Sequence, residues 1–320
     1  MQASKLDMKA PKLDLVVVGF TGELRALKLQ ARSIRLYAKP GMFGRIFYIC
    51  NDQAYGVFKR FITREVIPEL GNFSSQVEVV DYQKLVGKRI KKTGWRSQQA
   101  LKLLAAHIVT TPQFLILDSK NHFIRPFDTS VFMSADDKLC VNSVPINALF
   151  RQHFNAACDY FNVQGGKKID QAHPTTTPFM MATHIAKDLM DAVEAREGKP
   201  FFDVFLEKTE WNEFYLYYVY MLSKDKLLEA TYEEGPRYAL ALFGQAAESS
   251  ERVSMLIEAL EDPDICSTGV HRHVFEVGMS ENMAAITSMW LRFGLINTHA
   301  EAVYFQTFDK PVKRKRFILF

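Results

Sequence analysis

Strand-like and helix-like patterns alternate along residues 13–118, and this alternation constrains the fold of the chain more than any other feature. Short apolar runs such as LDLVVVGF and FLILD predict buried strands, whereas apolar residues three and four positions apart, as in TGELRALKLQARSIRLYA, predict helices. The predicted strands and helices follow one another at 13–20, 21–38, 45–50, 54–70, 76–85, 94–110 and 114–118. Strands and helices that alternate in this way form a mostly parallel sheet with helices on both faces, so we expect an α/β fold.

The carboxyl ends of the predicted strands are where we expect a ligand, since ligands of parallel α/β sheets bind outside these ends. The candidate segments are Gly19–Glu23, Asn51–Asp52 and Asp118–Asn121. After the fourth strand the alternation weakens and helical patterns predominate. We therefore expect one core at 13–245, preceded by a flexible N-terminus (1–12) and followed by a helical and strand extension with a basic tail (246–320).

Composition and short motifs exclude several classes of protein. The net charge is only +4, which does not call for a nucleic-acid-binding surface, and the four cysteines lie far apart without the spacing of a zinc site or a disulfide framework. The chain has no apolar run of about 20 residues, no signal-peptide pattern, no GxxxxGK[ST] and no GxSxG. VVVGFTGEL lacks the glycines of a dinucleotide-binding turn. These observations predict a soluble cytoplasmic protein.

Three segments, GWRSQQALKL, FLILDSKNHFIRP and WNEFYLYYVY, together resemble a group of bacterial glycosyltransferases with the GT-A fold, many of them poorly characterised. In that group a Trp…Gln-Gln-x-Leu-Lys-Leu helix precedes an apolar strand that ends in Asp-X-Asp, and Arg-Pro follows. A Pro-Phe segment, here TTTPFMMATH, and a Ser/Thr-Glu-x-x-x-Tyr helix come later, although Asn212 replaces the hydroxyl residue. The resemblance covers roughly residues 13–275 and implies a GT-A-like, Rossmann-type sheet.

The resemblance implies a site for a nucleotide-sugar donor and a glycan or glycolipid acceptor of polysaccharide biosynthesis. It makes Asp118 a residue that orients the donor and Glu213 the general base that deprotonates the acceptor hydroxyl. The residues that we expect to contact the donor are Thr21, Glu23, Asn51, Trp95, Gln99, Asp118, Lys120 and Asn121. The residues that we expect at the diphosphate or the acceptor are Arg96, Arg125, His173, His271, Arg272 and His273, of which His271 and His273 share one face of a predicted strand.

Lys120 is the main departure from the family pattern, because it stands where the second aspartate of Asp-X-Asp belongs. An ammonium group cannot ligate a metal, but it can balance part of the charge of a departing diphosphate. We therefore expect transfer without a metal, with Lys102 and the nearby arginines as further cations. The alternative is a weakly held manganese or magnesium ion on Asp118 and Asn121, with help from a late histidine.

Other interpretations of these residues remain open. Asp118 can be only a strand cap, Glu213 a partner in a buried salt bridge, and Trp95 and Gln99 packing groups. The alternative functions are a non-catalytic protein that binds a nucleotide or glycan, and another nucleotide-sugar or nucleotidyl-transferring enzyme. The tail Lys310–Phe320 combines basic and apolar residues, so it is either a solvated end or a peripheral contact with the inner face of an anionic membrane.

Overall fold

The computed structural model of the chain describes residues 12–243, 249–277 and 279–307. The tail Lys310–Phe320, most of the predicted N-terminal segment and part of the predicted boundary near residue 245 lie outside these ranges, and the proposed domain limits stay a prediction. None of the helices in the described ranges is long and apolar enough to cross a membrane.

A five-stranded sheet forms the centre of the molecule, with the strand order β3-β2-β1-β4-β9. The first four strands run parallel, and β9 is antiparallel to β4. Their bounds are Leu13–Gly19 (β1), Phe43–Cys50 (β2), Val77–Asp81 (β3), Gln113–Asp118 (β4) and Phe179–Ala182 (β9). This confirms the mostly parallel sheet predicted from the alternation of the sequence.

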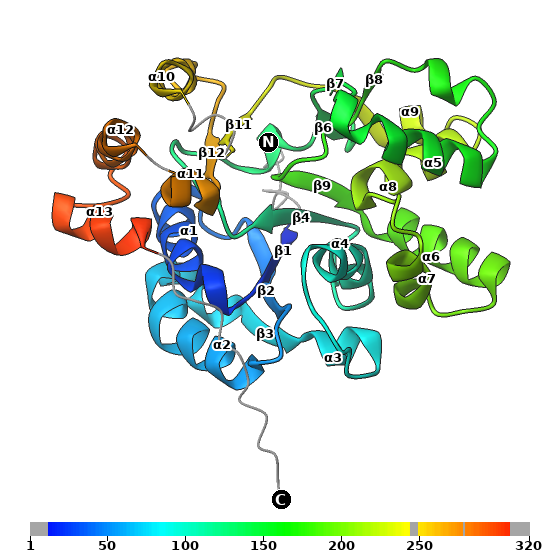
Figure 1. Cartoon of the computed structure of the whole chain (residues 1–320), viewed down its shortest axis with the longest axis horizontal. Helices are drawn as coiled ribbons and strands as arrows, with labels where there is room; N and C mark the ends of the chain where they lie inside the picture. The colour runs from blue at the N-terminus through cyan, green and yellow to red at the C-terminus, as the bar shows by residue number, and fades with distance from the viewer. Residues whose placement is uncertain (1–11, 244–248, 278, 308–320) are drawn as a thin grey trace, which may run out of the picture.

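Helices cover both faces of this sheet (Figure 1). The helices on one side are α1 (Leu24–Tyr37) and α2 (Tyr55–Phe61), and those on the other side are α4 (Trp95–Leu104), α6 (Thr183–Glu197) and α7 (Phe201–Glu207). The helical spacing of Leu24, Leu27, Ala31 and Ile34 accounts for the orientation of α1, because all four side chains are buried against the sheet side.

Two predicted elements are shorter than the sequence pattern indicates. The predicted helix at 54–70 is α-helical only through Phe61, and a π-helical turn (Ile62–Val66) and a 3₁₀ segment (Ile67–Gln76) follow it. Pro68 lacks the backbone donor that a regular α-helix needs there. The predicted strand at 76–85 ends at Asp81, whose side chain accepts a hydrogen bond from the backbone of Gln83 and so starts α3 (Tyr82–Val86).

The aromatic-rich helix α8 (Glu213–Leu222) is buried on nearly every side and packs against α5 (Arg151–Phe161). Asn212 caps it, because the side-chain oxygen accepts hydrogen bonds from the backbone of Phe214 and Tyr215. An asparagine therefore serves as well as the hydroxyl residue of the family pattern at this position. The remaining short elements here are β6 (Leu139–Val141), β7 (Val144–Pro145), β8 (Gln171–Ala172), α9 (Leu227–Thr231) and β10 (Tyr232–Glu234).

A second sheet joins the C-terminal segment to the end of β4. Its strands are β11 (Ala239–Leu242), β12 (Ser267–Val270) and β5 (Asn121–Phe123), and β12 runs antiparallel to β5. The helices around it are α10 (Ser250–Ala259), α11 (Arg272–Val277), α12 (Ser280–Arg292) and α13 (His299–Gln306). The indole nitrogen of Trp290 donates to Nε2 of His122 over 3.0 Å, which ties α12 to β5.

The expected strand through 267–277 is wrong beyond Val270, because the chain turns there into α11. The backbone N–H of His271 still donates to the carbonyl of Leu242 over 2.9 Å, and Nδ1 of His271 accepts a hydrogen bond from the backbone of His273 over 3.3 Å, which favours a turn at this point. His271 and His273 therefore come together through this turn, with 4.9 Å between their ring centres, and not through strand alternation.

Candidate functional site

A cavity of about 670 Å³ lies at the carboxyl ends of β1 and β4, where the sheet topology predicts a ligand. The side chains that line it come from α4, from the loop after β4, from the start of α8 and from the C-terminal segment. Among them are nine of the residues predicted from the sequence: Glu23, Trp95, Gln99, Lys102, Asp118, Lys120, Glu213, His271 and His273. The volume is in the usual range for a small-molecule site.

Two lysines and two acids alternate at the centre of this cavity. The Nζ of Lys102 lies 2.8 Å from Oδ1 of Asp118 and 3.1 Å from Oε1 of Glu213. Lys120 pairs with the other oxygen of Asp118. The side chain of Lys102 is only 6% exposed, so its two ion pairs are shielded from water and fix the relative positions of the two acids.

The charges at the centre are set by this pairing. Burial alone would raise the pKa of Asp118, but the ammonium groups of Lys102 and Lys120 outweigh it and hold the pKa well below its usual range. Burial would likewise lower the pKa of Lys102, and the two neighbouring carboxylates raise it instead. Asp118 is therefore an anion, and Lys102 a cation, near neutral pH.

Glu213 differs from Asp118, because burial raises its pKa more than Lys102 lowers it. Its Oε2 atom has no hydrogen-bond partner within the described part of the chain, although the residue is only 2% exposed. A carboxylate with one free, buried oxygen and a raised pKa is suited to accept a proton from a bound hydroxyl group near neutral pH. This geometry is what the predicted general base requires.

The other side of the cavity holds Glu23 and a group of rings. Burial raises the pKa of Glu23 against the opposing hydrogen bond from the hydroxyl of Ser119. The Nζ of Lys120 lies 5.7 Å from the centre of the Phe243 ring, which is 6.2 Å from the ring of His271. Burial, with the nearby cations, lowers the pKa of His271 to about 4, so the imidazole is neutral at physiological pH.

Three residues that we expected to contact the nucleotide-sugar donor do not line the cavity, and they support the loops around it. Thr21 donates from its backbone and hydroxyl to Asp52, and Asn51 is hydrogen-bonded to Ser97 and to the carbonyl of Gly94. Asn121 accepts hydrogen bonds from the backbone of Asp118 and from the hydroxyl of Thr177, at 2.8 and 2.6 Å. These bonds hold the strand ends in place, and direct contacts of the three residues with a donor stay a prediction.

Four predicted diphosphate or acceptor residues also lie outside the cavity lining. Arg96 donates to backbone carbonyls at the end of α7 and before α8, and Arg125 donates to the carbonyls of Leu260 and Ile265 at 2.5 and 2.6 Å. His173 is buried among Tyr218, Tyr232 and Phe179, and burial lowers its pKa to about 3. Arg272 pairs with Glu276 on α11 at 3.5 Å. Backbone carbonyls, packing and the ion pair with Glu276 account for the positions of these groups, and none of the four lines the cavity.

The oxygen atoms that could ligate a metal at the centre of the cavity do not fit a divalent cation. Both oxygens of Asp118 face ammonium groups, and the side-chain oxygen of Asn121 already accepts two hydrogen bonds. Within residues 12–243, 249–277 and 279–307, no three His, Cys, Asp or Glu side chains are grouped as metal ligands. A metal on Asp118 and Asn121 would have to displace Lys120 and break the bonds that hold the loop after β4.

Several residues of the cavity were not assigned to it from the sequence. Asn147, Leu149 and Phe150 lie in or beside a 3₁₀ turn (Ala148–Phe150), and Phe243 follows a short strand. Thr175 and Thr176 begin the segment TTTPFMMATH, which was part of the family resemblance but was not assigned to the site. Only the tertiary fold places them beside Glu213 or Lys120. Ser119 and Asn212, by contrast, adjoin predicted site residues and could have been included on that ground.

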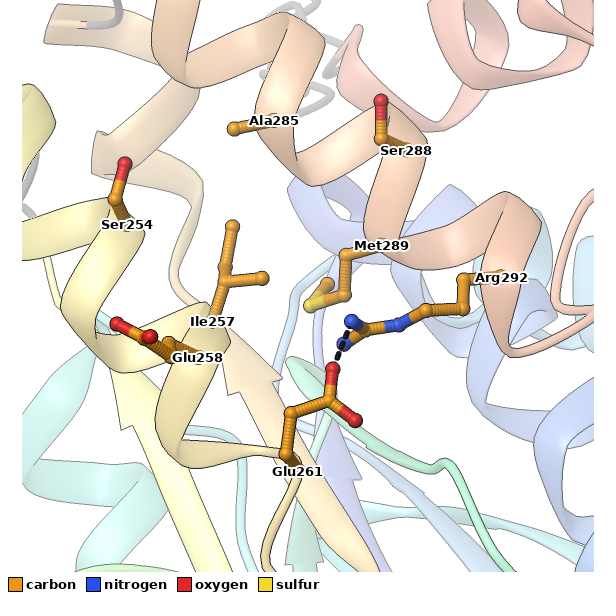
Figure 2. A pocket seen from close by; sticks show the side chains of 8 residues that line it. All are labelled: Ser254, Ile257, Glu258, Glu261, Ala285, Ser288, Met289 and Arg292. Carbon is orange, nitrogen blue, oxygen red and sulfur yellow. Dashed lines mark hydrogen bonds and ion pairs between the residues drawn. The ribbon is translucent and has the colours of Figure 1, made fainter.

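A second hollow lies between α10 and α12 and has a different character (Figure 2). Its lining includes Ile257, Met289 and Ala285, and Glu261 and Arg292 bridge its lower end (Figure 2). Glu261 and Arg292 pair with each other, the hydroxyl of Ser288 donates to the carbonyl of Ala284, and no buried polar side-chain atom of this lining lacks a partner among the described residues. The chemistry therefore belongs to the cavity at the sheet edge.

Comparisons with known proteins agree with the fold and leave the activity open. A model of a family described as "Family of unknown function (DUF6492)" matches residues 17–259, and no curated protein matches the sequence. An active-site mutant of LgtC matches with a TM-score of 0.50 and 11% identity over 92% of this chain and 100% of that one. Another structure of LgtC is described as a galactosyltransferase with donor and acceptor sugar analogues.

Two further solved structures are less similar. The bifunctional glycosyltransferase WbbM matches at 9% identity with a TM-score of 0.48, over 95% of this chain but only 53% of its own, so this chain spans about half of that protein. Mouse xyloside xylosyltransferase 1 matches at 11% identity with a TM-score of 0.41 over 81% of this chain and 98% of its own. Together with the sheet topology, the likeness to LgtC confirms the predicted GT-A-like α/β fold.

Proposed function

This chain belongs to the DUF6492 family, whose function is unknown, and from its site we propose that it is a glycosyltransferase that moves a sugar from a nucleotide-sugar donor to a glycan hydroxyl. One observation carries the proposal: Asp118 and Glu213 meet across Lys102 at the carboxyl edge of a GT-A-like sheet, and Glu213 keeps one buried oxygen without a partner among the described residues. That oxygen is the natural place for the acceptor hydroxyl.

Each central residue has a separate task in the proposed reaction. Glu213 takes the proton of the acceptor hydroxyl as its oxygen attacks the anomeric carbon, and the bond from that carbon to the diphosphate breaks. Asp118 orients the donor. Lys102 keeps the two carboxylates at a fixed separation, and it binds Oε1 of Glu213, which leaves Oε2 for the proposed proton transfer.

Transfer without a divalent cation is part of the proposal. Lys120 stands at the second aspartate position of the family pattern and is paired with Asp118 in the described structure. A unit charge about 4 Å from a phosphate contributes about 4 kcal/mol at an effective dielectric constant near 20, which is half of what a dication supplies. The neutral imidazole of His271 adds a hydrogen-bond donor to the diphosphate and no charge.

The biological setting follows from the sequence resemblance. We propose a glycan or glycolipid acceptor of bacterial surface polysaccharide synthesis, a cytoplasmic location, and peripheral attachment to anionic lipid through Lys310–Phe320. Truncation after Asp309 tests the last point, because the proposal requires it to weaken the binding of the protein to anionic vesicles.

A thermal-shift screen of nucleoside diphosphates and nucleotide-sugars, each with manganese and with a chelator, tests the proposed function first. A ligand of the native state raises the melting temperature, and a metal-free site keeps the shift in the chelator. Release of free nucleoside diphosphate in a turnover assay separates a glycosyltransferase from a nucleotidyltransferase, which releases pyrophosphate. A shift only with manganese contradicts the role of Lys120, and a shift without turnover indicates a binding protein.

A further inference from the structure

We propose that the cavity is divided by charge, and that the half around Trp95 and Leu149 is the subsite for a neutral saccharide acceptor. We call Trp95, Gln99, Leu149, Phe150, Asn212 and Glu213 the aromatic half, and Glu23, Ser119, Lys120, Phe243, His271 and His273 the cationic half. The inference rests on the proposed function and names the acceptor's place and chemistry. It moves Trp95 and Gln99 from the predicted donor contacts to the acceptor.

The aromatic half is held together around the start of α8. Arg96 donates to Oε1 of Gln99 over 2.9 Å and also to the carbonyl of Trp211, which directly precedes Asn212. His153, at the start of α5, is hydrogen-bonded to the carbonyl of Glu210 over 2.6 Å, and this fixes the turn that carries Leu149 and Phe150 near the same point. Gln99 and the turn before α5 are thus anchored to the segment that delivers Glu213.

Large apolar side chains are left in contact with water in this half. Trp95 is 54% exposed and Leu149 is 66% exposed, although both line a concave cavity. Exposed apolar groups that converge on a cavity indicate a ligand surface. A flat indole matches the C–H face of a pyranose ring, because the negative face of its π-system attracts the weakly positive C–H groups.

Among the six residues of the aromatic half, two buried polar atoms have no partner within the described residues: Nε2 of Gln99 and Oε2 of Glu213. Both residues are at least 98% buried. Because Arg96 has only donors to offer, its bond to Gln99 fixes the amide oxygen toward Arg96 and the amide nitrogen away from it. The subsite therefore presents one donor and one acceptor, and a saccharide hydroxyl, which both accepts and donates, satisfies the two together.

The distribution of cations favours the cationic half for the diphosphate. Lys102 is bound to two carboxylates, Asp118 and Glu213, and Arg96 is directed to Gln99 and to backbone carbonyls. Lys120 is bound to one carboxylate, Asp118, and borders the rings of Phe243 and His271, so it has fewer bonds to exchange when a diphosphate binds. A charged diphosphate therefore gains more electrostatic stabilisation in the cationic half, and the neutral acceptor is left with the aromatic half.

The tryptophans of the chain provide a direct test. Of the three tryptophans, Trp211 and Trp290 are 1% and 2% exposed, so acrylamide quenching of the fluorescence reports mainly on Trp95. We expect neutral methyl pyranosides and short oligosaccharides to protect the fluorescence, and nucleoside diphosphates to leave it quenched. The proposal is overturned if the nucleotides protect the fluorescence instead. It is also overturned if no saccharide protects the fluorescence at any concentration up to its solubility limit. Trp95→Phe removes the signal and identifies its source.

Kinetics provide a second test that does not depend on fluorescence. We expect Trp95→Ala to raise the acceptor KM about tenfold and Trp95→Phe to keep the KM close to that of the original chain. The shift in melting temperature that the donor induces should be the same in both variants as in the original chain. Val303→Ala, an equally exposed apolar site on α13, is the matched control. An unchanged acceptor KM overturns the proposal. Saccharide protection without any donor turnover would contradict the proposed transferase and leave the subsite standing.

Discussion

Asp14 and Asp118 occupy opposite ends of two neighbouring strands, and the fold treats the two carboxylates in opposite ways. Asp14, at the start of β1, is fully buried, and its oxygens accept bonds from the backbone of Arg45 and Thr110 and from the Thr110 hydroxyl, at 2.6–3.0 Å. Gly44 leaves room for it, since a Cβ there would lie 2.9 Å from Oδ1. Backbone donors cannot leave, so Asp14 is a permanent structural group.

Asp118, at the end of β4, is instead balanced by side-chain cations that border a cavity. Lysine ammonium groups turn on flexible stems and can change partners when an anionic ligand arrives. The contrast separates a carboxylate that holds the fold from one that, in the proposed function, is available to a ligand, although both sit on the same sheet. Variants of Asp14 should therefore affect stability, whereas variants around Asp118 should affect ligand binding and transfer.

The largest effect is expected at the carboxyl edge. Glu213→Gln removes the proton acceptor while it preserves shape, so we expect transfer to fall by about 10²- to 10⁴-fold with donor affinity nearly unchanged. Turnover and donor binding by calorimetry check this. An equal loss of both would make Glu213 a structural acid like Asp14 and remove the contrast.

At the amino edge the expected loss is in stability. Asp14→Asn replaces an oxygen by an amide group that cannot accept from the backbone, which should lower the free energy of unfolding by about 2–3 kcal/mol. Urea unfolding measures the loss, and kcat per folded molecule should stay the same. A fall in kcat at unchanged stability would mean that the two ends are coupled.

Lys120 tests how the diphosphate is balanced. Lys120→Met removes a charge near the leaving group and should weaken binding of a nucleoside diphosphate about tenfold, whereas Lys120→Arg should retain most of it. Titration calorimetry in a chelator gives both affinities. Unchanged affinity in the methionine variant would place the diphosphate elsewhere in the cavity.

The pH dependence of the transfer rate should report on Glu213 and not on His271. Because burial raises the pKa of Glu213, its proton-accepting form is lost as the pH falls through a value above the ordinary 4.5, and the rate should drop about tenfold per pH unit below it. His271, with a pKa of about 4, adds no transition near 6.5. Profiles of kcat/KM for the original chain and for His271→Gln check this, and an acid limb at or below 4.5 would argue against Glu213 as the base.

The smallest effect is expected at the cap of α8. Asn212→Ser keeps a side-chain acceptor for the first turn and should change stability by less than about 0.5 kcal/mol, whereas Asn212→Ala should cost about 1 kcal/mol. Thermal unfolding of both variants measures the difference. A large loss with serine would give the asparagine a role beyond capping.

The fold of the N-terminal half could be predicted from the sequence because its signals are local. Apolar runs and helical spacing require no knowledge of distant residues, and the carboxyl-edge rule then brought Glu23, Asp118 and Lys120 to one place. The ends of elements were less predictable, as the change from α-helix to a π-helical turn after Phe61 and the turn into α11 after Val270 show.

The cations show what sequence reasoning could not supply. Arg96 and Lys102 are two turns of one helix apart and look equivalent in the sequence, yet one binds carbonyls and the other two carboxylates. The carbonyls that Arg96 binds belong to a turn about 110 residues further along the chain. Leu149 and Phe150 reach the cavity for the same non-local reason, from a segment without a regular pattern.

The pairing of β5 with β12 has a consequence for biogenesis. β5 follows Lys120 directly, but its partner is made about 145 residues later, and Phe243, His271 and His273 belong to the same late segment. During synthesis the cavity must therefore stay open on its cationic side, with the edge of β5 unpaired, until the C-terminal segment leaves the ribosome. Any fragment that ends before residue 267 would carry that bare edge permanently, and edges of this kind recruit other chains.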